Sequence, residues 1–263
     1  MEKITVALAA NANYGDPLLV AVGSLARLAS VPIAFVVLDG GLTERQRQLV
    51  SRAIARVSRL SHEIRFVRVD DSRFRGYRLM NGNAMAYARL LLPGLLTEEW
   101  TLYCDADVIW QGDVAELWQE RGEDVLAVAT PDCEDSARKD EGIFGEYFCT
   151  GIMLMNLAGW RREGTAKQCI NWLDSNPEAR FWDQSAINHI LKGRVKLIDK
   201  MWNRYVGESG PCRVMHYAGA NPWRFGIRKN RLDRYKLMWF RELARLRSSL
   251  VGWEILRAKL SQN

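Results

Sequence analysis

The residues whose types and spacing best suit chemistry are two aspartates, Asp105 and Asp107, which directly follow the apolar stretch 100–104. Alternate side chains of an extended backbone point the same way, so both carboxylates can face one point in space. Two carboxylates at the end of a buried strand cost desolvation free energy unless a cation lies between them. A hard divalent cation that also holds phosphate oxygens meets this need, and the pattern therefore predicts a protein that handles a metal–diphosphate substrate.

The same pair has a commoner interpretation, as solvated turn carboxylates or helix caps. Its position favours the metal site. Residues 100–104 are typical of a strand, and residues 114–118 have helical apolar spacing after Asp113, a residue type that caps helices. Carboxylates at the carboxyl end of a strand in an α/β sheet lie where such sheets bind their ligands.

Strand and helix patterns alternate along the first half of the chain, and these elements must position the aspartates. The expected strands are 4–10, 33–38, 64–69 and 100–104, and the expected helices are 16–28, 43–60 and 84–92. Thr43 and Gln46 have capping-box spacing at the start of the second helix. Such alternation predicts βαβ units, and therefore an α/β fold with a mostly parallel central sheet flanked by helices.

The second half mixes strands and helices. The expected strands are 124–129 and 151–157, and the expected helices lie near 160–173 and 183–191. The polar, acidic and glycine-containing segment 131–145 is open to two interpretations, a loop near the site or a surface excursion.

The composition suits one α/β domain with a substantial core, since 48% of the 263 residues are hydrophobic and 26% are charged. No stretch approaches the roughly 18 consecutive apolar residues of a membrane span. Residues 1–8 lack the basic region of a signal peptide and are expected to lead into the first strand. The five cysteines include no Cys-x-x-Cys pair, so we expect a cytoplasmic protein without a zinc cluster or a disulfide framework.

The positive charge is concentrated at the C-terminus. Residues 224–263 carry 11 Lys/Arg and 3 Asp/Glu, whereas residues 1–223 carry 26 and 28. Apolar residues recur close to helical spacing over 232–260, so we expect a domain at 1–223 and a basic amphipathic helical tail at 224–263. The tail fits binding to an anionic membrane surface, or docking on the domain with its basic face solvated. No nucleic-acid-binding motif is found, and no nucleic-acid partner is expected.

Six stretches within the first 223 residues resemble glycosyltransferase family 8, in the family's order. The family contains glycogenin and the bacterial lipooligosaccharide galactosyltransferases. The stretches are 9–14, 87–90, 103–107, 147–152, 182–188 and 216–219. The resemblance implies a GT-A-type, Rossmann-like nucleotide-sugar-binding fold, UDP-glucose or UDP-galactose as donor, Mn²⁺ or Mg²⁺, and transfer with retention at the anomeric carbon.

The resemblance implies a set of metal ligands. Asp105 and Asp107 match the family's metal-binding aspartates, and His216 matches its third protein ligand; without the resemblance, His216 fits a structural histidine in a turn. Two carboxylates and an imidazole leave coordination sites for diphosphate oxygens, and this mixed set suits Mn²⁺ better than Mg²⁺. The metal would neutralise the charge that develops on the departing nucleoside diphosphate.

The resemblance also implies residues that bind the nucleotide-sugar. Asn11, Asn13 and Tyr14 match residues that contact the nucleoside, although the family usually has Asp at the position of Asn11, whose amide both accepts and donates. Arg89 matches an arginine near the donor phosphates and sugar, where a fixed cationic fork is suitable. The complete set of expected donor-binding residues is Ala9, Asn11, Asn13, Tyr14, Arg89, Asp105, Ala106, Thr150, Gly151, Asp183, Gly219 and Asn221.

Asp183 and Gln184 are the expected catalytic residues. In the family the matching aspartate binds sugar hydroxyls, and the matching glutamine lies near the reacting anomeric centre. Because an amide is a poor nucleophile, we expect a front-face mechanism, in which the acceptor hydroxyl attacks as the diphosphate leaves and Gln184 steadies an oxocarbenium-like state. A double displacement needs a well-placed carboxylate, which the sequence does not identify.

Two positions depart from the family pattern. Cys149 replaces an asparagine that usually touches the donor sugar. Asn221 stands where the family has a lysine that neutralises the diphosphate, in a segment one residue shorter. Two outcomes follow from this change: Arg224 substitutes for the cation, or the affinity is lower.

These observations leave three hypotheses. The first is a retaining, metal-dependent hexosyltransferase that acts on a glycan linked to lipid or protein, at the inner face of a bacterial plasma membrane. The departures at Cys149 and Asn221 motivate the second, a catalytically weakened domain that binds a sugar or a partner. The third is a nucleotidyltransferase, against which the loop 11–15 argues because it lacks the cations that this class uses.

Overall fold

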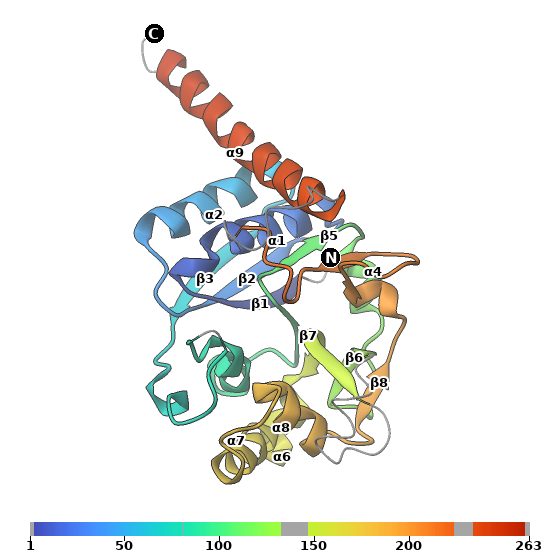
Figure 1. The fold of residues 1–263 in the computed structure, drawn as a ribbon. Coiled ribbons are helices and arrows are strands. Elements are labelled where there is room, and N and C mark those ends of the chain that lie inside the picture. The colour runs from blue at the N-terminus through green and yellow to red at the C-terminus, as the bar shows by residue number, and fades with distance from the viewer. Residues whose placement is uncertain (1–2, 81, 133–146, 224–233, 261–263) are drawn as a thin grey trace.

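The computed structural model describes residues 3–80, 82–132, 147–223 and 234–260, with side chains as far as residue 248 (Figure 1). A central seven-stranded sheet carries helices on both faces, and a three-stranded sheet lies beside it. The strands of the central sheet are β1 (Ile4–Ala10), β2 (Ile33–Asp39), β3 (Glu63–Arg68), β4 (Trp100–Cys104), β6 (Ala127–Pro131), β7 (Phe148–Asn156) and β8 (Val195–Leu197).

The central sheet has the order β3-β2-β1-β4-β7-β6-β8. Strand β7 pairs antiparallel with both of its neighbours, whereas the other neighbouring pairs are parallel. Strand β7 is therefore the one reversed strand in this sheet. The prediction of a mostly parallel α/β fold is confirmed, and the helical crossovers between β1, β2 and β3 explain the parallel half.

Helices α1 (Gly15–Leu28) and α2 (Glu44–Val57) cover one face of this parallel half (Figure 1). The capping box of α2 forms as predicted. Thr43 Oγ1 accepts from Gln46 N at 3.2 Å, and Gln46 Oε1 accepts from Thr43 N at 2.9 Å. The predicted cap of α4 (Val114–Trp118) is also present, because Asp113 Oδ1 accepts from Ala115 N at 3.0 Å.

The opposite face carries helices from the second half of the chain (Figure 1). These are α6 (Leu157–Glu163), α7 (Thr165–Ser175) and α8 (Trp182–Ile190). The stretch predicted to be helical near 160–173 thus comprises two helices, which are separated where Gly164 adopts the left-handed conformation with φ 65°.

The helix predicted at 84–92 is a 3₁₀ helix, Met85–Leu91, which continues into α3 (Leu92–Leu95). Pro93 accounts for the last turn of this helix, because it has no N–H to donate to the carbonyl of Arg89. Leu92 N donates to Arg89 O instead, which is the i to i+3 bond of a 3₁₀ turn. Further 3₁₀ segments are Ala12–Tyr14, Ser72–Phe74 and Lys200–Asn203.

Sequence reasoning missed β8 and the three-stranded sheet. That sheet has the order β5-β10-β9 and is formed by β5 (Val108–Trp110), β9 (Arg204–Tyr205) and β10 (Val214–His216). Strands this short show no measurable periodicity. Strands β6 and β7 lie within a few residues of their predicted positions, and most of the segment 131–145 lies outside the described residues.

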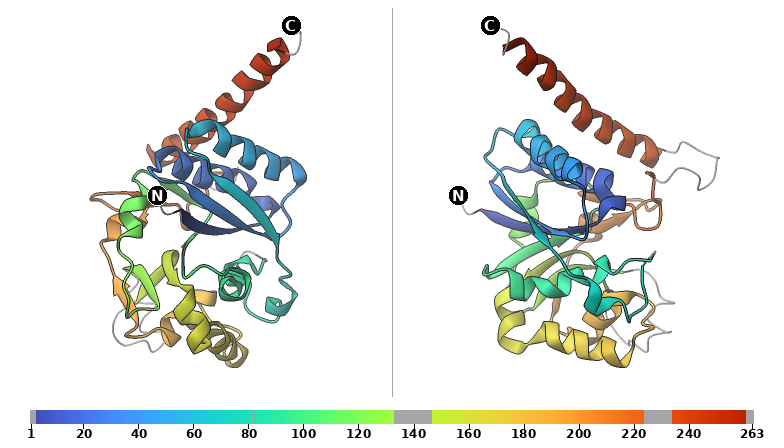
Figure 2. Two further views of the ribbon diagram at one scale, coloured as in Figure 1. Left: turned by 180° about the vertical axis from the view of Figure 1, so that it is seen from behind. Right: turned by 90° about the vertical axis from the view of Figure 1, so that its left-hand side faces the viewer.

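Helix α9 (Arg234–Leu260) begins on top of α1 and α2, and its C-terminal half projects away from the rest of the molecule (Figure 2). Trp239 and Leu246 are buried in the same core as α1. The predicted boundary at 223/224 adjoins residues outside the described ranges and stays a prediction. Across the described ranges, every helix is too short or too polar to cross a membrane.

Candidate active site

Asp105, Asp107 and His216 form a compact cluster just beyond the carboxyl end of β4. One ligand atom from each lies within 4.8 Å of the other two. His216 Nε2 is 3.3 Å from Asp107 Oδ1 and 3.8 Å from Asp105 Oδ2. The antiparallel pairing of β10 with β5 places His216 opposite Val108 and therefore beside the aspartates. The structure thus brings together the three expected metal ligands from distant parts of the chain.

The orientation of His216 suits a metal ligand. Its Nδ1 lies 2.8 Å from Asn203 Oδ1, so Nδ1–H donates and Nε2 faces the carboxylates. Burial lowers the pKa of His216, but neighbouring groups, Asp107 above all, outweigh it and raise that pKa well above its usual value. A proton on His216 offsets the carboxylate charge, and a divalent cation would replace that proton. The two carboxylates and one imidazole fit Mn²⁺ or Mg²⁺.

Gly151 of β7 lies directly against this cluster. A Cβ atom at this position would lie 2.6 Å from His216 Cε1 and 2.7 Å from Asp105 Oδ2. The backbone also approaches closely, since Asp105 N donates to Gly151 O at 2.7 Å. Only glycine leaves room for both ligand side chains at this point of the β4–β7 pair.

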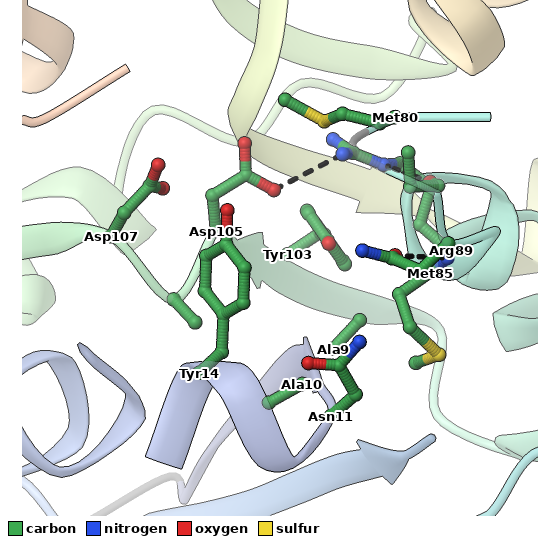
Figure 3. A pocket seen from close by; sticks show the side chains of 13 residues that line it. Ala9, Ala10, Asn11, Tyr14, Met80, Met85, Arg89, Tyr103, Asp105 and Asp107 are labelled. Carbon is green, nitrogen blue, oxygen red and sulfur yellow. Dashed lines mark hydrogen bonds and ion pairs between the residues drawn. The ribbon is translucent and has the colours of Figure 1, made fainter. Parts of the chain in front are cut away.

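Arg89 is buried and links the metal cluster to Asp183. Its Nη2 lies 3.1 Å from Asp105 Oδ1 (Figure 3). Its Nε lies 2.8 Å from Asp183 Oδ2. Its Nη1 donates to Thr150 O, and the guanidinium lies 4.0 Å from the centre of the Tyr103 ring. These contacts use the planar fork of the arginine to fix the positions of two carboxylates.

Asp183 opens helix α8 and is only 2% exposed. Burial raises the pKa of Asp183 to about 7, with a further increase from Asp105, although Arg89 opposes the shift. A cation bound at the metal cluster would reduce the repulsion from Asp105 and lower this pKa. In the metal-free protein Asp183 therefore takes up a proton near neutral pH, and a bound cation would favour its charged form.

Hydrogen bonds at both ends fix the orientation of the Gln184 amide. Its Oε1 accepts from Thr150 N at 3.1 Å, and its Nε2 donates to Asp132 Oδ2 at 3.1 Å. Tyr147 OH lies 3.3 Å from the same nitrogen. The amide is thus held between β7 and the residue that follows β6.

Asp132 is a carboxylate of this site that sequence reasoning missed. Its Oδ2 accepts from Gln184 and, at 3.4 Å, from Tyr205 OH. Its Oδ1 is buried and has no hydrogen-bond partner among the described residues. Such an oxygen has unused capacity for a ligand hydroxyl. The usable signal was the position of Asp132 just after a strand, in the segment 131–145 that is open to two interpretations, a loop near the site or a surface excursion.

Most of the predicted site residues lie around two adjoining cavities. The larger has a volume of about 340 Å³ and is lined by Asp132, Cys149, Thr150, Gly151, Asp183, Gln184, Tyr205 and His216, among others. The smaller is lined by Ala9, Asn11, Tyr14, Met85, Tyr103 and Ala106, among others (Figure 3). Arg89, Asp105 and Asp107 line both cavities and therefore lie where the two meet.

Three expected donor-binding residues, Asn13, Gly219 and Asn221, are not among the lining residues of either cavity. Asn13 N donates to Asn11 Oδ1 at 3.1 Å and so shapes the loop after β1. Asn221 has a φ of 37°, which is uncommon for a residue with a side chain. Arg224, the candidate substitute cation, lies outside the described residues.

The fold and the Asp-Asp-His cluster define a glycosyltransferase of the GT-A type. The chain belongs to glycosyl transferase family 8, whose sequence profile matches residues 5–225. The family inferred from six short motifs is therefore confirmed.

Several known proteins are similar to this chain. A "Putative glycosyltransferase" of Haemophilus influenzae is 26% identical over 242 residues, which are 84% of this chain and 72% of that protein. General stress protein A of Bacillus subtilis is 24% identical over 181 residues, or 65% of this chain and 62% of its own length. The crystal structure of the galactosyltransferase LgtC with donor and acceptor sugar analogues has a TM-score of 0.80 at 25% identity, covering 92% of this chain and 95% of LgtC.

Proposed function

We propose that this chain is a metal-dependent, retaining hexosyltransferase that uses UDP-glucose or UDP-galactose as donor. The observation that carries the proposal is the position of the Asp105–Asp107–His216 cluster at the junction of the two cavities. A nucleoside in the smaller cavity and a hexose in the larger would place the diphosphate at the cluster. The likeness to LgtC, a galactosyltransferase in complex with donor and acceptor sugar analogues, supports this class of substrate.

Asp105, Asp107 and His216 would hold Mn²⁺ or Mg²⁺, which supplies charge neutralisation for the departing diphosphate. Asp183 binds hydroxyls of the donor sugar. Arg89 contacts both Asp183 and Asp105 and so fixes the positions of the two carboxylates relative to each other. Gln184 presents an amide of fixed orientation to the anomeric centre. Because an amide is a poor nucleophile, the acceptor hydroxyl attacks on the face from which the diphosphate leaves.

Asp132 is the candidate nucleophile for a double displacement, which needs a carboxylate near the anomeric centre. However, its Oδ2 already accepts hydrogen bonds from Gln184 and Tyr205. These bonds favour a role in orienting Gln184 and binding an acceptor hydroxyl over a role as nucleophile. The front-face mechanism therefore remains our proposal.

The acceptor in this proposal is a glycan on a lipid or a protein. Helix α9 presents three exposed arginines along its described part, Arg241, Arg245 and Arg247, of which Arg245 pairs with Glu242 and Arg247 with Asp16. A basic surface of this kind attracts anionic lipid headgroups. We place the enzyme in the cytoplasm, peripherally bound to the inner face of the plasma membrane.

The experiment that tests the donor site is release of UDP from a panel of UDP-sugars, with and without Mn²⁺. In Asp105→Ala we expect Mn²⁺-dependent release to fall by at least about 100-fold, because a ligand and its charge are lost. Asp124→Ala removes an exposed carboxylate and should leave the rate unchanged. Equal rates for Asp105→Ala and the unaltered chain would overturn the proposal.

A second candidate is a weakened domain that binds a nucleotide-sugar without turnover. The replacement of the family lysine by Asn221 and of the family asparagine by Cys149 favours it. Binding of UDP and Mn²⁺ without turnover across a broad acceptor panel would support this candidate, and metal-dependent donor hydrolysis would exclude it. Membership of a glycosyltransferase family argues against the nucleotidyltransferase hypothesis.

A further inference from the structure

Three aromatic rings connect the loop after β1 with helix α9. The Tyr14 ring meets the Trp223 ring edge to face, with centroids 5.7 Å apart and planes at 61°. The Trp223 ring in turn meets the Trp239 ring at 5.7 Å and 40°. Trp239 is 1% exposed. The side chain of Tyr14 lines the smaller cavity (Figure 3), so the row of rings runs from the cavity wall to the core under α9.

Two ion pairs also hold α9 against α1. Arg247 Nη2 lies 2.7 and 2.8 Å from the two carboxylate oxygens of Asp16, two residues after Tyr14. On the neighbouring turn of α9, Glu242 accepts from Arg27 Nε of α1 at 3.2 Å. Helix α9 is therefore bonded to both ends of α1, the helix that begins at the nucleoside loop.

Close packing completes the contact. A Cβ atom on Gly23 of α1 would lie 2.5 Å from Leu246 Cδ2, so the two helices approach closely at this glycine. Near the start of α9, Tyr217 OH donates to Tyr235 O at 2.7 Å. Tyr217 directly follows His216, so α9 also contacts the segment that carries the third metal ligand.

We propose that Trp239 is a positioning residue for the donor nucleotide, which acts by holding Trp223 and, through it, Tyr14. The inference rests on the proposed function, in which Tyr14 contacts the nucleoside. The backbone of the loop is held separately by α2, because Gln46 Nε2 donates to Ala12 O at 2.8 Å. The ring of Tyr14 itself, however, packs against Trp223, and the orientation of that ring forms part of the cavity wall.

A thermodynamic consequence follows from this arrangement. If docked α9 favours the Tyr14 conformation that binds nucleotide, bound nucleotide must favour docked α9 by the same factor. The helix that carries the basic surface is thus coupled to the donor site. Undocking of α9 from the domain would therefore lower nucleotide affinity without any change at the metal ligands.

The test compares Trp239→Leu, Trp239→Phe and the unaltered chain. We expect Trp239→Leu to weaken UDP binding in the presence of Mn²⁺ by about tenfold, because the ring contact that holds Trp223 against Tyr14 is lost. The KM for the donor should rise by the same factor while kcat at saturating donor stays within about twofold. Trp239→Phe, which keeps a ring, should recover most of the affinity. Isothermal titration calorimetry and initial rates measure these quantities.

Trp118→Leu is the matched control. Trp118 is buried in the same core, and its indole N–H, like that of Trp239, has no hydrogen-bond partner among the described residues. It lies on α4, where its ring packs against the guanidinium of Arg121. This variant should lose thermal stability without a change in UDP affinity. Equal loss of UDP affinity in Trp118→Leu and Trp239→Leu would overturn the positioning role.

A second measurement uses the unaltered chain, so it does not depend on how the variants fold. We expect UDP with Mn²⁺ to increase the protection of amides 237–246 from hydrogen exchange. Absence of that increase, in a protein that binds UDP, would overturn the inference and leave the proposed function intact. Failure of the unaltered chain to bind any uridine nucleotide would instead overturn the proposed function, and the inference with it.

Discussion

At the scale of single residues, the site combines a few charged groups whose protonation depends on one another. Arg89 lies between Asp105 and Asp183, and His216 lies against Asp105 and Asp107. In the cluster of Asp105, Asp107 and His216, a protonated His216 offsets one of the two carboxylate charges, whereas a divalent cation offsets both. This balance makes both metal affinity and stability depend on pH.

Stability of the metal-free protein should fall as the pH rises, from about 4 to about 7 as Asp183 loses its proton, and further above about 6.5 as His216 loses its proton. Asp107 raises the pKa of His216 against the effect of burial, and burial raises the pKa of Asp183 to about 7. Because both folded-state pKa values lie above their usual values, each group stabilises the fold at low pH and loses that contribution as the pH rises through its folded-state pKa. Thermal unfolding in EDTA across this range measures the effect.

Added Mn²⁺ should reverse the trend, because it binds the deprotonated cluster and so stabilises most at high pH. In His216→Gln we expect a smaller pH dependence and weaker stabilisation by Mn²⁺. Metal-free stability that rises with pH over this range would contradict the assigned shifts.

The loop after β1 makes a prediction about base selectivity. Asn11 Oδ1 accepts from Asn13 N, so the amide nitrogen is the end of the side chain that is not bound to the loop. An amide N–H₂ cannot accept a hydrogen bond from the N3–H of uracil, whereas the second oxygen of an aspartate can. Asn11→Asp should therefore strengthen UDP binding about tenfold relative to CDP. Competition binding with the two nucleotides measures this ratio, and an unchanged ratio would remove Asn11 from base recognition.

At the scale of elements, two strand pairings assemble the metal cluster. The β4–β7 pair sets Gly151 against Asp105, and the β5–β10 pair sets His216 beside Asp107. Strands β5 and β10 have three residues each. Their pairing is defined by contact with the rest of the fold, because strands this short do not pair stably alone.

Gly151→Ala should reduce Mn²⁺-dependent activity by about 100-fold, because the new methyl group would displace the His216 ring or the Asp105 carboxylate. Gly94→Ala is the matched control. A Cβ at Gly94 meets no atom within 4 Å, so this variant should keep full activity. Manganese affinity and initial rates distinguish the two substitutions, and full activity in Gly151→Ala would show that the cluster tolerates a methyl group at this position.

At the scale of the whole molecule, α9 packs against the core with its first half and projects away from the domain with its second half (Figure 2). Its first turns bury Trp239 and Leu246, whereas its last turns extend beyond α1 and α2. Removing the entire tail would expose this apolar surface. A useful truncation therefore ends the chain after Ser248.

We expect the chain truncated after Ser248 to keep UDP binding and to lose at least about half of its binding to vesicles that contain anionic lipid. Removal of the apolar and basic residues beyond 248 lowers the affinity of α9 for a membrane surface. Cosedimentation with anionic vesicles, and with neutral vesicles as control, measures the effect. Unchanged cosedimentation would count against the membrane role.

The sequence by itself determined most of the strands and helices of the first half, and the aspartate pair. Strand alternation, the capping box at Thr43 and the cap at Asp113 depend on a few adjacent residues, and all three are present in the structure. The i and i+2 spacing of Asp105 and Asp107 likewise needs no information from elsewhere in the chain. The family, and with it His216 as third ligand, followed from motifs that remain local even though they are scattered.

Only the tertiary structure decided what surrounds these residues. Asp132 accepts a hydrogen bond from Gln184, and Arg89 contacts two carboxylates, those of Asp105 and Asp183. Helix α9 contacts Tyr14 through two tryptophans, Trp223 and Trp239. Each of these contacts joins residues that are far apart in sequence. These contacts depend on sheet order, strand register and helix docking, which are set by the free energy of the whole chain. Local periodicity reports only on neighbouring residues and therefore does not predict them.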